Sequence, residues 1–119
     1  MANFQPAGWH TVTPRIIVKD AGKLVDFVKE VFGATGDYRP EVPAEMRLGD
    51  SIVMISEASV RDPSLACLYV YVENADATWQ RAVKAGAKSM EAPSDTPYGD
   101  RRGMVKDPWG NTWQIATRR

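Results

Sequence analysis

The chain has 119 residues, of which 44% are hydrophobic and 25% charged, a composition that predicts one globular domain over residues 1–119. Fifteen lysines and arginines balance fifteen aspartates and glutamates, so no net positive charge attracts the whole molecule to nucleic acid or to an anionic membrane. The N-terminal segment lacks the basic start and apolar run of a signal peptide, and no stretch reaches 18 consecutive apolar residues. We therefore expect a cytoplasmic protein that binds neither nucleic acid nor membranes. The single cysteine, Cys67, excludes a disulfide within the chain.

Two similar segments of the chain each predict a strand followed by a helix. Residues 15–34 read RIIVKDAGKLVDFVKEVFGA, and residues 69–87 read YVYVENADATWQRAVKAGA. In each segment the apolar period changes from two to about 3.6 at a candidate capping residue, Asp20 in the first and Asn74 in the second. Each helical pattern then ends before a glycine. The repetition predicts one fold built from two copies of a strand and helix unit.

In chain order, the patterns predict two βαβββ modules of an α+β fold. The first module spans about residues 13–57, with strands over 13–19, near Tyr38, over 45–48 and over 51–56, and a helix over 21–32. Residues 58–65 are expected to form a linker. The second module spans about 66–117, with a helix over 75–85 and strands near 66–73, 87–92, 103–106 and 112–117. The sequence DPWGN at 107–111 predicts the turn of the last hairpin, because proline presets the first turn position and glycine accepts a positive φ.

The alternation of residues along the strands predicts a face for each side chain. One set is entirely apolar and should face the helices: Ile16, Val18, Val53, Ile55, Leu68, Val70, Val72, Trp113 and Ile115. The opposite set is chemically mixed and includes Thr13, Arg15, Met54, Cys67, Tyr69, Tyr71 and Gln114. A mixed face between curled sheets favours a concave ligand site. The alternatives are a face that is only exposed to solvent or one that is buried in a dimer.

Three segments carry a resemblance to a known family: PRIIVKDAGKLVDFVKEVFGA, LYVYVENADATWQRAVKAGA and DRRGMVKDPWGNTWQIAT. They resemble the vicinal oxygen chelate superfamily, which includes glyoxalase I, extradiol dioxygenases, and fosfomycin and bleomycin resistance proteins. The similarity extends from Thr13 onward and looks most like the small PhnB-like or glyoxalase-like branch. It implies two βαβββ modules whose mixed sheets curl around a cleft, and a homodimer that in some members exchanges modules between chains.

The resemblance also implies a divalent metal held by a histidine on the first strand and a glutamate on the last strand of each module. In this chain these positions fall at Thr13, Met54, Cys67 and Gln114. Such side chains suit a hard divalent cation poorly, because it prefers carboxylate oxygen or imidazole nitrogen. We therefore expect no metal in the usual site and no cofactor, and we assign no catalytic residue.

The residues predicted to line the ligand-binding cleft are Arg15, Met54, Tyr69, Tyr71, Tyr98, Arg102 and Gln114. By resemblance, Trp109 borders the mouth of the cleft. Aromatic walls suit a planar or amphipathic molecule, and arginine suits an anionic or carbonyl group. The predicted function is binding of such a small molecule, of the sequestration or resistance type or in an uncharacterised role. The alternative is a metal-dependent lyase, isomerase or dioxygenase with a displaced ligand set that includes His10 and a glutamate.

Overall fold

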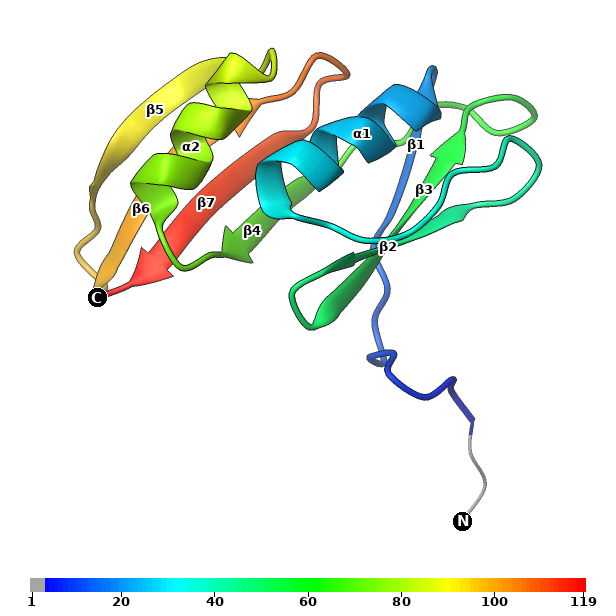
Figure 1. The fold of residues 1–119 in the computed structure, drawn as a ribbon, viewed down its shortest axis with the longest axis horizontal. Helices are drawn as coiled ribbons and strands as arrows, with labels where there is room; N and C mark the ends of the chain where they lie inside the picture. Colours follow the sequence, from blue (N-terminus) through cyan, green and yellow to red (C-terminus); the bar gives the residue numbers. More distant parts are fainter. Residues whose placement is uncertain (1–3) are drawn as a thin grey trace.

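The computed structural model describes residues 4–119 and contains two mixed sheets, each packed against one helix (Figure 1). The first module consists of β1 (Arg15–Val18), α1 (Ala21–Phe32), β2 (Ala44–Leu48) and β3 (Ser51–Glu57). The second consists of β4 (Cys67–Tyr71), α2 (Ala75–Lys84), β5 (Lys88–Asp95), β6 (Asp100–Lys106) and β7 (Thr112–Arg118). The strand orders are β1-β3-β2 and β4-β7-β6-β5, and in each sheet the first strand of the module runs parallel to the last. The predicted α+β fold of two repeated modules is confirmed.

The first module has one regular strand fewer than the sequence predicted. In place of a strand near Tyr38, residues 35–42 contribute two isolated bridges. Pro40 and Pro43 interrupt this segment, and proline has no N–H to donate to a sheet. The Tyr38 ring instead packs over the start of α1, where a Cβ on Gly22 would lie 3.1 Å from it. The expectation of a regular strand at this position was wrong.

The hairpin of β5 and β6 is longer than predicted. Residues 100–102 belong to β6 instead of a loop, and β5 continues to Asp95 through two shifts of register. The turn between the strands is closed by Thr96, whose N–H donates to the Asp100 carbonyl at 2.7 Å and whose Oγ1 accepts from the Asp100 N–H at 2.9 Å. This extension places Arg102 at a fixed position in the sheet.

The apolar face predicted from strand alternation forms the core. The residues of this face that are buried to 5% exposure or less are Ile16, Val18, Val53, Ile55, Trp113 and Ile115. Its three members from the β4 segment, Leu68, Val70 and Val72, are partly buried and pack against this core. Their greater exposure follows from the position of β4 at the edge of its sheet.

The two helices begin in different ways. At α2 the Asn74 side chain accepts from the Ala77 N–H at 3.0 Å, so the predicted cap is confirmed. Asp20 makes no such bond and adopts a left-handed φ of 61°, so the expected cap of α1 was wrong. The carboxylate of Glu57, at the end of β3, accepts from the backbone N–H of Asp20 at 3.1 Å and of Ala21 at 3.0 Å.

The same place in the second module is taken by Thr117, near the end of β7. Its hydroxyl accepts from the Ala75 N–H at 2.9 Å and donates to the Val72 carbonyl at 2.8 Å. In both modules a side chain of the last strand therefore satisfies the first N–H of the helix, which has no partner within the helix itself.

The predicted turn at residues 107–111 is present and carries a buried polar network. The Asp107 carboxylate accepts from the backbone N–H groups of Trp109 and Asn111, from the Asn111 amide at 2.9 Å and from the Trp113 indole at 2.8 Å. Asn111 in turn accepts from the Ala66 N–H at 2.8 Å. The turn thereby fixes the chain just before β4.

The two modules meet along their helices, which lie on the same side of the sheets (Figure 1). Arg81 of α2 donates to the Val31 carbonyl of α1 at 3.0 Å. Phe27 of α1 packs edge-on against Trp109 with ring centroids 6.1 Å apart. Neither helix within residues 4–119 has the length and apolar content needed to span a bilayer. The opposite side of each sheet carries no helix, and we call it the open face of that module.

Candidate functional site

The open face of the second module is identified by the position of Gly103. A Cβ at this residue would lie 2.6 Å from the Trp79 ring of α2, so Gly103 faces the helix and its neighbours in β6 face away. Strand pairing then places residues of β4, β5 and β7 on the same face as these outward-facing residues of β6. The open face comprises Cys67, Tyr69, Tyr71, Lys88, Glu91, Ser94, Asp100, Arg102, Met104, Lys106, Thr112, Gln114, Ala116 and Arg118.

A buried carboxylate organises one end of this face. Asp100 has 0% exposure, and its Oδ2 accepts from the hydroxyl of Tyr69 at 2.7 Å and of Tyr71 at 2.8 Å. The Nε of Arg118 lies 3.1 Å from the other oxygen. Three side chains from β4 and β7 thus converge on the first residue of β6, and they fix the two tyrosine rings relative to the sheet.

The hydrogen bonds around Tyr69 have a defined direction. Because the Tyr69 hydroxyl donates to Asp100, it accepts from the Tyr98 hydroxyl, 3.1 Å away. The Tyr98 oxygen accepts from Nη1 of Arg102 at 3.2 Å, and the same nitrogen donates to Gln114 Oε1 at 3.3 Å. We call these residues the tyrosine–arginine cluster: Tyr69, Tyr71, Tyr98, Asp100, Arg102 and Gln114.

Ionisation in the cluster follows from these contacts. The hydrogen bond from Tyr69 lowers the pKa of Asp100, against the effect of burial, and the Tyr71 bond and the Arg118 charge lower it further. Loss of hydration raises the pKa of the Tyr69 hydroxyl far above its usual value, and its bonds to Tyr98 and Asp100 act in the same direction. Asp100 is therefore an anion and Tyr69 is neutral at pH 7. A carboxylate with a lowered pKa and two hydroxyl partners is a weak base, so Asp100 positions the tyrosines and is poorly suited to removing a proton.

The aromatic rings of the cluster are unusually accessible for large side chains. Tyr71 is 57% exposed, Tyr98 52% and Tyr69 37%. The rings of Tyr69 and Tyr71 have centroids 5.3 Å apart and are inclined at 55°. Because the hydroxyls are held, the two inclined rings form a rigid aromatic surface on which a planar molecule can stack on one ring and contact the other at an angle.

Arg102 is the cationic member of the cluster, with a side chain that is 22% exposed. Besides Tyr98 and Gln114, it contacts Glu91, whose Oε1 lies 3.2 Å from Nη2. Its Nε is buried and has no hydrogen-bond partner among residues 4–119. The guanidinium therefore retains a donor that its neighbours do not use.

The structure brings together five of the seven residues predicted to line a ligand site, Tyr69, Tyr71, Tyr98, Arg102 and Gln114. The other two, Arg15 and Met54, are paired neighbours on the open face of the first module. Arg15 donates from Nε to the Ser56 hydroxyl at 3.1 Å. Within the described part of the chain, no hydrogen bond joins Arg15 or Met54 to the tyrosine–arginine cluster.

The positions equivalent to the family's metal ligands do not form a site for a hard divalent cation. Gln114 Nε2 lies 3.7 Å from Cys67 Sγ, a contact between an amide and a thiol with no carboxylate or imidazole. No group of three or more histidine, cysteine, aspartate or glutamate side chains within residues 4–119 could hold a metal ion. His10 is exposed in the arm before β1, and Glu57 is occupied at the start of α1. The residues present do not fit the metal that the family implies.

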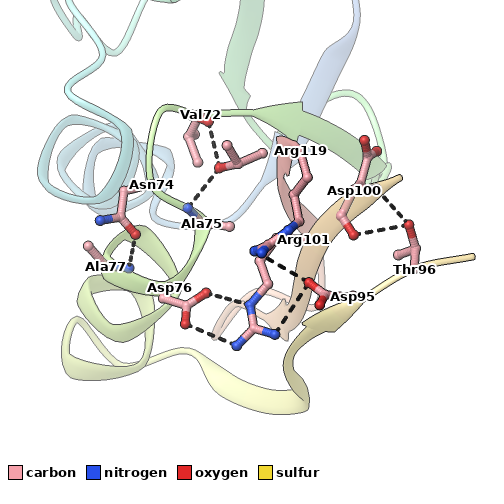
Figure 2. A network of polar contacts seen from close by, with 11 residues as sticks. Val72, Asn74, Ala75, Asp76, Ala77, Asp95, Thr96, Asp100, Arg101 and Arg119 are labelled. Carbon is pink, nitrogen blue, oxygen red and sulfur yellow. Dashed lines mark hydrogen bonds and ion pairs between the residues drawn. The ribbon is translucent and has the colours of Figure 1, made fainter. Parts of the chain in front are cut away.

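The sequence did not identify Asp100, Glu91 or Arg118 as parts of the site. Asp100 has the same strand parity as Arg102. The sequence predicts this strand only from residue 103, so the alternation rule was not applied to Asp100. Arg101, which has the other parity, lies on the helix side and pairs with Asp76 at 3.0 Å and with Asp95 at 3.6 Å, as Figure 2 shows. Of the two adjacent arginines, only Arg102 therefore lies on the open face.

Two further features bear on where a ligand could bind. Trp109, expected at the mouth of a cleft, packs instead between the modules against Phe27. A groove of about 540 Å³ lies between the modules, and its walls include Phe32, Val70 and Arg81. Tyr71 borders this groove as well as the open face.

Comparison with known proteins places this chain in a family. Residues 9–115 match the model of the Glyoxalase/Bleomycin resistance protein/Dioxygenase superfamily. The chain belongs to this superfamily. The expected membership is therefore confirmed, whereas the PhnB-like branch stays a prediction.

The chain is similar to mycobacterial proteins and to several solved structures. The uncharacterized protein Mb0911c of Mycobacterium bovis is 30% identical over 96% of this chain and 84% of its own length. The uncharacterized protein Rv0887c of Mycobacterium tuberculosis is also 30% identical, over 96% of this chain and 75% of its own length.

Among solved structures, TioX from Micromonospora sp. ML1 has a TM-score of 0.76 at 23% identity, covering 92% of this chain and 99% of its own. The fosfomycin resistance protein FosX from Mesorhizobium loti has a TM-score of 0.69 at 18% identity, with 92% of each chain covered. At these identities the likeness concerns the fold.

Proposed function

We propose that this protein binds a small planar or amphipathic molecule on the open face of the second module, without the divalent metal that the superfamily commonly uses. The observation that carries the proposal is the tyrosine–arginine cluster, in which buried Asp100 fixes exposed Tyr69 and Tyr71 beside Arg102. Flat exposed rings with fixed hydroxyls suit stacking combined with directional hydrogen bonds. Capture of this kind fits a sequestration or resistance role, and we assign no reaction.

The chemistry of the donor set supports the metal-free part of the proposal. Thr13, Met54, Cys67 and Gln114 offer a hydroxyl, a thioether, a thiol and an amide in place of two imidazoles and two carboxylates. A displaced set would need His10 together with a glutamate. Glu57, a glutamate of the first module, accepts from two N–H groups of α1, and releasing it would leave them without that acceptor.

We further propose that the protein acts as a homodimer in which a second copy covers part of the open faces. The supporting observation is apolar surface outside the core: Phe4 is 83% exposed, Val12 77% and Tyr71 57%. Phe4 and Val12 belong to the arm before β1 and Tyr71 to β4, and covering them with a second copy would remove this apolar surface from water. The cytoplasmic location, the single domain over residues 1–119 and the participation of Arg15 and Met54 stay predictions.

A thermal melting screen with planar compounds tests the binding proposal. A ligand at about 100 times its Kd should stabilise the native protein by about 2.7 kcal/mol. Tyr71→Ala should abolish most of this shift, while Val60→Ala, at a linker residue with 98% exposure, should preserve it. An equal shift in wild type and Tyr71→Ala would contradict the assignment of the site. Light scattering should report the mass of two chains.

A further inference from the structure

The open face of the second module is positively charged although the whole chain is neutral. Strand pairing places four cationic side chains and two carboxylates on it, leaving a surplus of two positive charges. The cations are Lys88, Arg102, Lys106 and Arg118, and the carboxylates are Glu91 and Asp100. Such a surplus favours an anion at this face over a cation.

The two carboxylates differ in how firmly they are held. Asp100 is buried and contacts two tyrosines and Arg118, so it is not available to a ligand. The Glu91 side chain is 50% exposed and reaches Arg102 at 3.2 Å. Glu91 is therefore the acidic partner that an incoming group can replace.

Arg102 is not fully engaged by its present neighbours. Its contact with the Glu91 carboxylate measures 3.2 Å, longer than the roughly 2.7–2.9 Å usual for such a pair, and its bonds to the neutral Tyr98 and Gln114 measure 3.2 and 3.3 Å. Its buried Nε has no partner in the described part of the chain. A planar carboxylate can accept two parallel bonds from a guanidinium, a geometry that these long single contacts do not provide.

We propose that the ligand of this face is a planar aromatic acid whose carboxylate replaces Glu91 on Arg102 while its ring lies against Tyr71 and Tyr69. This inference rests on the proposed function and names its ligand class. The centre of the arrangement is one row of the sheet, because Arg102 and Tyr71 are both paired with Ala116 on β7. Ala116 stands between Arg102 and Tyr71 in the sheet and is itself fully buried. A cationic ligand would be repelled by the surplus positive charge. Its accessible acidic partner on this face would be Glu91, which already contacts Arg102.

Titration calorimetry with three probes of nearly equal shape tests this class: 2-naphthoate, neutral 2-naphthamide and 2-naphthylmethylammonium. Naphthoate should bind at least tenfold more tightly than naphthamide, and the ammonium compound should bind most weakly. Arg102→Gln should remove the preference for the acid, so that this variant binds naphthoate and naphthamide with equal affinity. Glu91→Gln should tighten naphthoate about threefold, because the competing carboxylate is removed.

Glu30→Gln is the matched control, since it makes the same change of charge at an exposed residue of α1. Equal affinity for naphthoate and naphthamide, or preference for the ammonium compound, would overturn the ligand class and leave the binding function intact. A naphthoate affinity that Glu91→Gln lowers or leaves unchanged would refute the exchange at Arg102, even if Arg102→Gln fails to fold. Absence of binding by all three probes would overturn both the ligand class and the proposed function.

Discussion

Glu57→Ala should lower the free energy of unfolding by about 1–2 kcal/mol, because Glu57 caps α1 from a neighbouring strand. Its two oxygens accept from the N–H groups of Asp20 and Ala21 at 3.1 and 3.0 Å. Ala21 is fully buried, so the substitution leaves its N–H poorly solvated, at a cost of about 1 kcal/mol. Loss of a negative charge near the positive end of a helix costs a further 0.3–1 kcal/mol, approximately.

Urea unfolding followed by tryptophan fluorescence measures this change. Glu57→Gln keeps one acceptor oxygen and should lose about half as much, on the order of 0.5–1 kcal/mol. Glu41→Ala, an exposed loop residue, is the control and should change stability by less than about 0.5 kcal/mol. The decrease in the free energy of unfolding caused by Glu57→Ala should be identical with and without EDTA. A loss seen only when divalent metal is supplied would refute the capping role and favour the metal-dependent enzyme.

Three further predictions concern the second module. Gly103→Ala should destabilise the protein by about 1–3 kcal/mol in the same urea assay, because its Cβ would lie 2.6 Å from Trp79; unchanged stability would mean that Gly103 does not face α2. The lowered pKa of Asp100 gives stability that is full above about pH 4 and lost as the pH falls further, so Asp100→Asn should show a shallower acid decline of its urea midpoint, and parallel declines would contradict this role. The raised pKa of Tyr69 means that its contribution is present below about pH 10 and lost only at higher pH. Wild type and Tyr69→Phe should therefore develop equal phenolate absorbance up to pH 11, and a deficit of one tyrosine in the variant would show that Tyr69 ionises normally.

The parts of the fold that the sequence predicted well depend on local patterns. The apolar spacing from Leu24 onward predicted α1, and strand alternation predicted the buried face that contains Ile16 and Trp113. The parity of Tyr69 and Gln114 correctly placed them on one side of a sheet. These signals are local because helix and strand periodicities are properties of short segments.

The features that the sequence did not predict depend on contacts between distant residues. Glu57 caps a helix that begins 36 residues earlier, and no spacing rule within a helix identifies such a partner. Asp100 lies outside the strands that the sequence predicts, because the apolar alternation predicts this strand only from residue 103. Only the pairing of Asp100 with Arg118 extends β6 to include it. The strand expected near Tyr38 does not form because Pro40 and Pro43 interrupt the segment, and the Tyr38 ring packs instead against Gly22.

The most direct test of metal-free binding on the open face is a nuclear magnetic resonance titration of the EDTA-treated protein with 2-naphthoate. Saturable shifts should be concentrated at Tyr69, Tyr71 and Arg102 and should be unchanged when the chelator is omitted. Shifts centred on Phe32 and Val70 in the groove between the modules, or binding that appears only after a divalent metal is restored, would contradict metal-free binding on the open face.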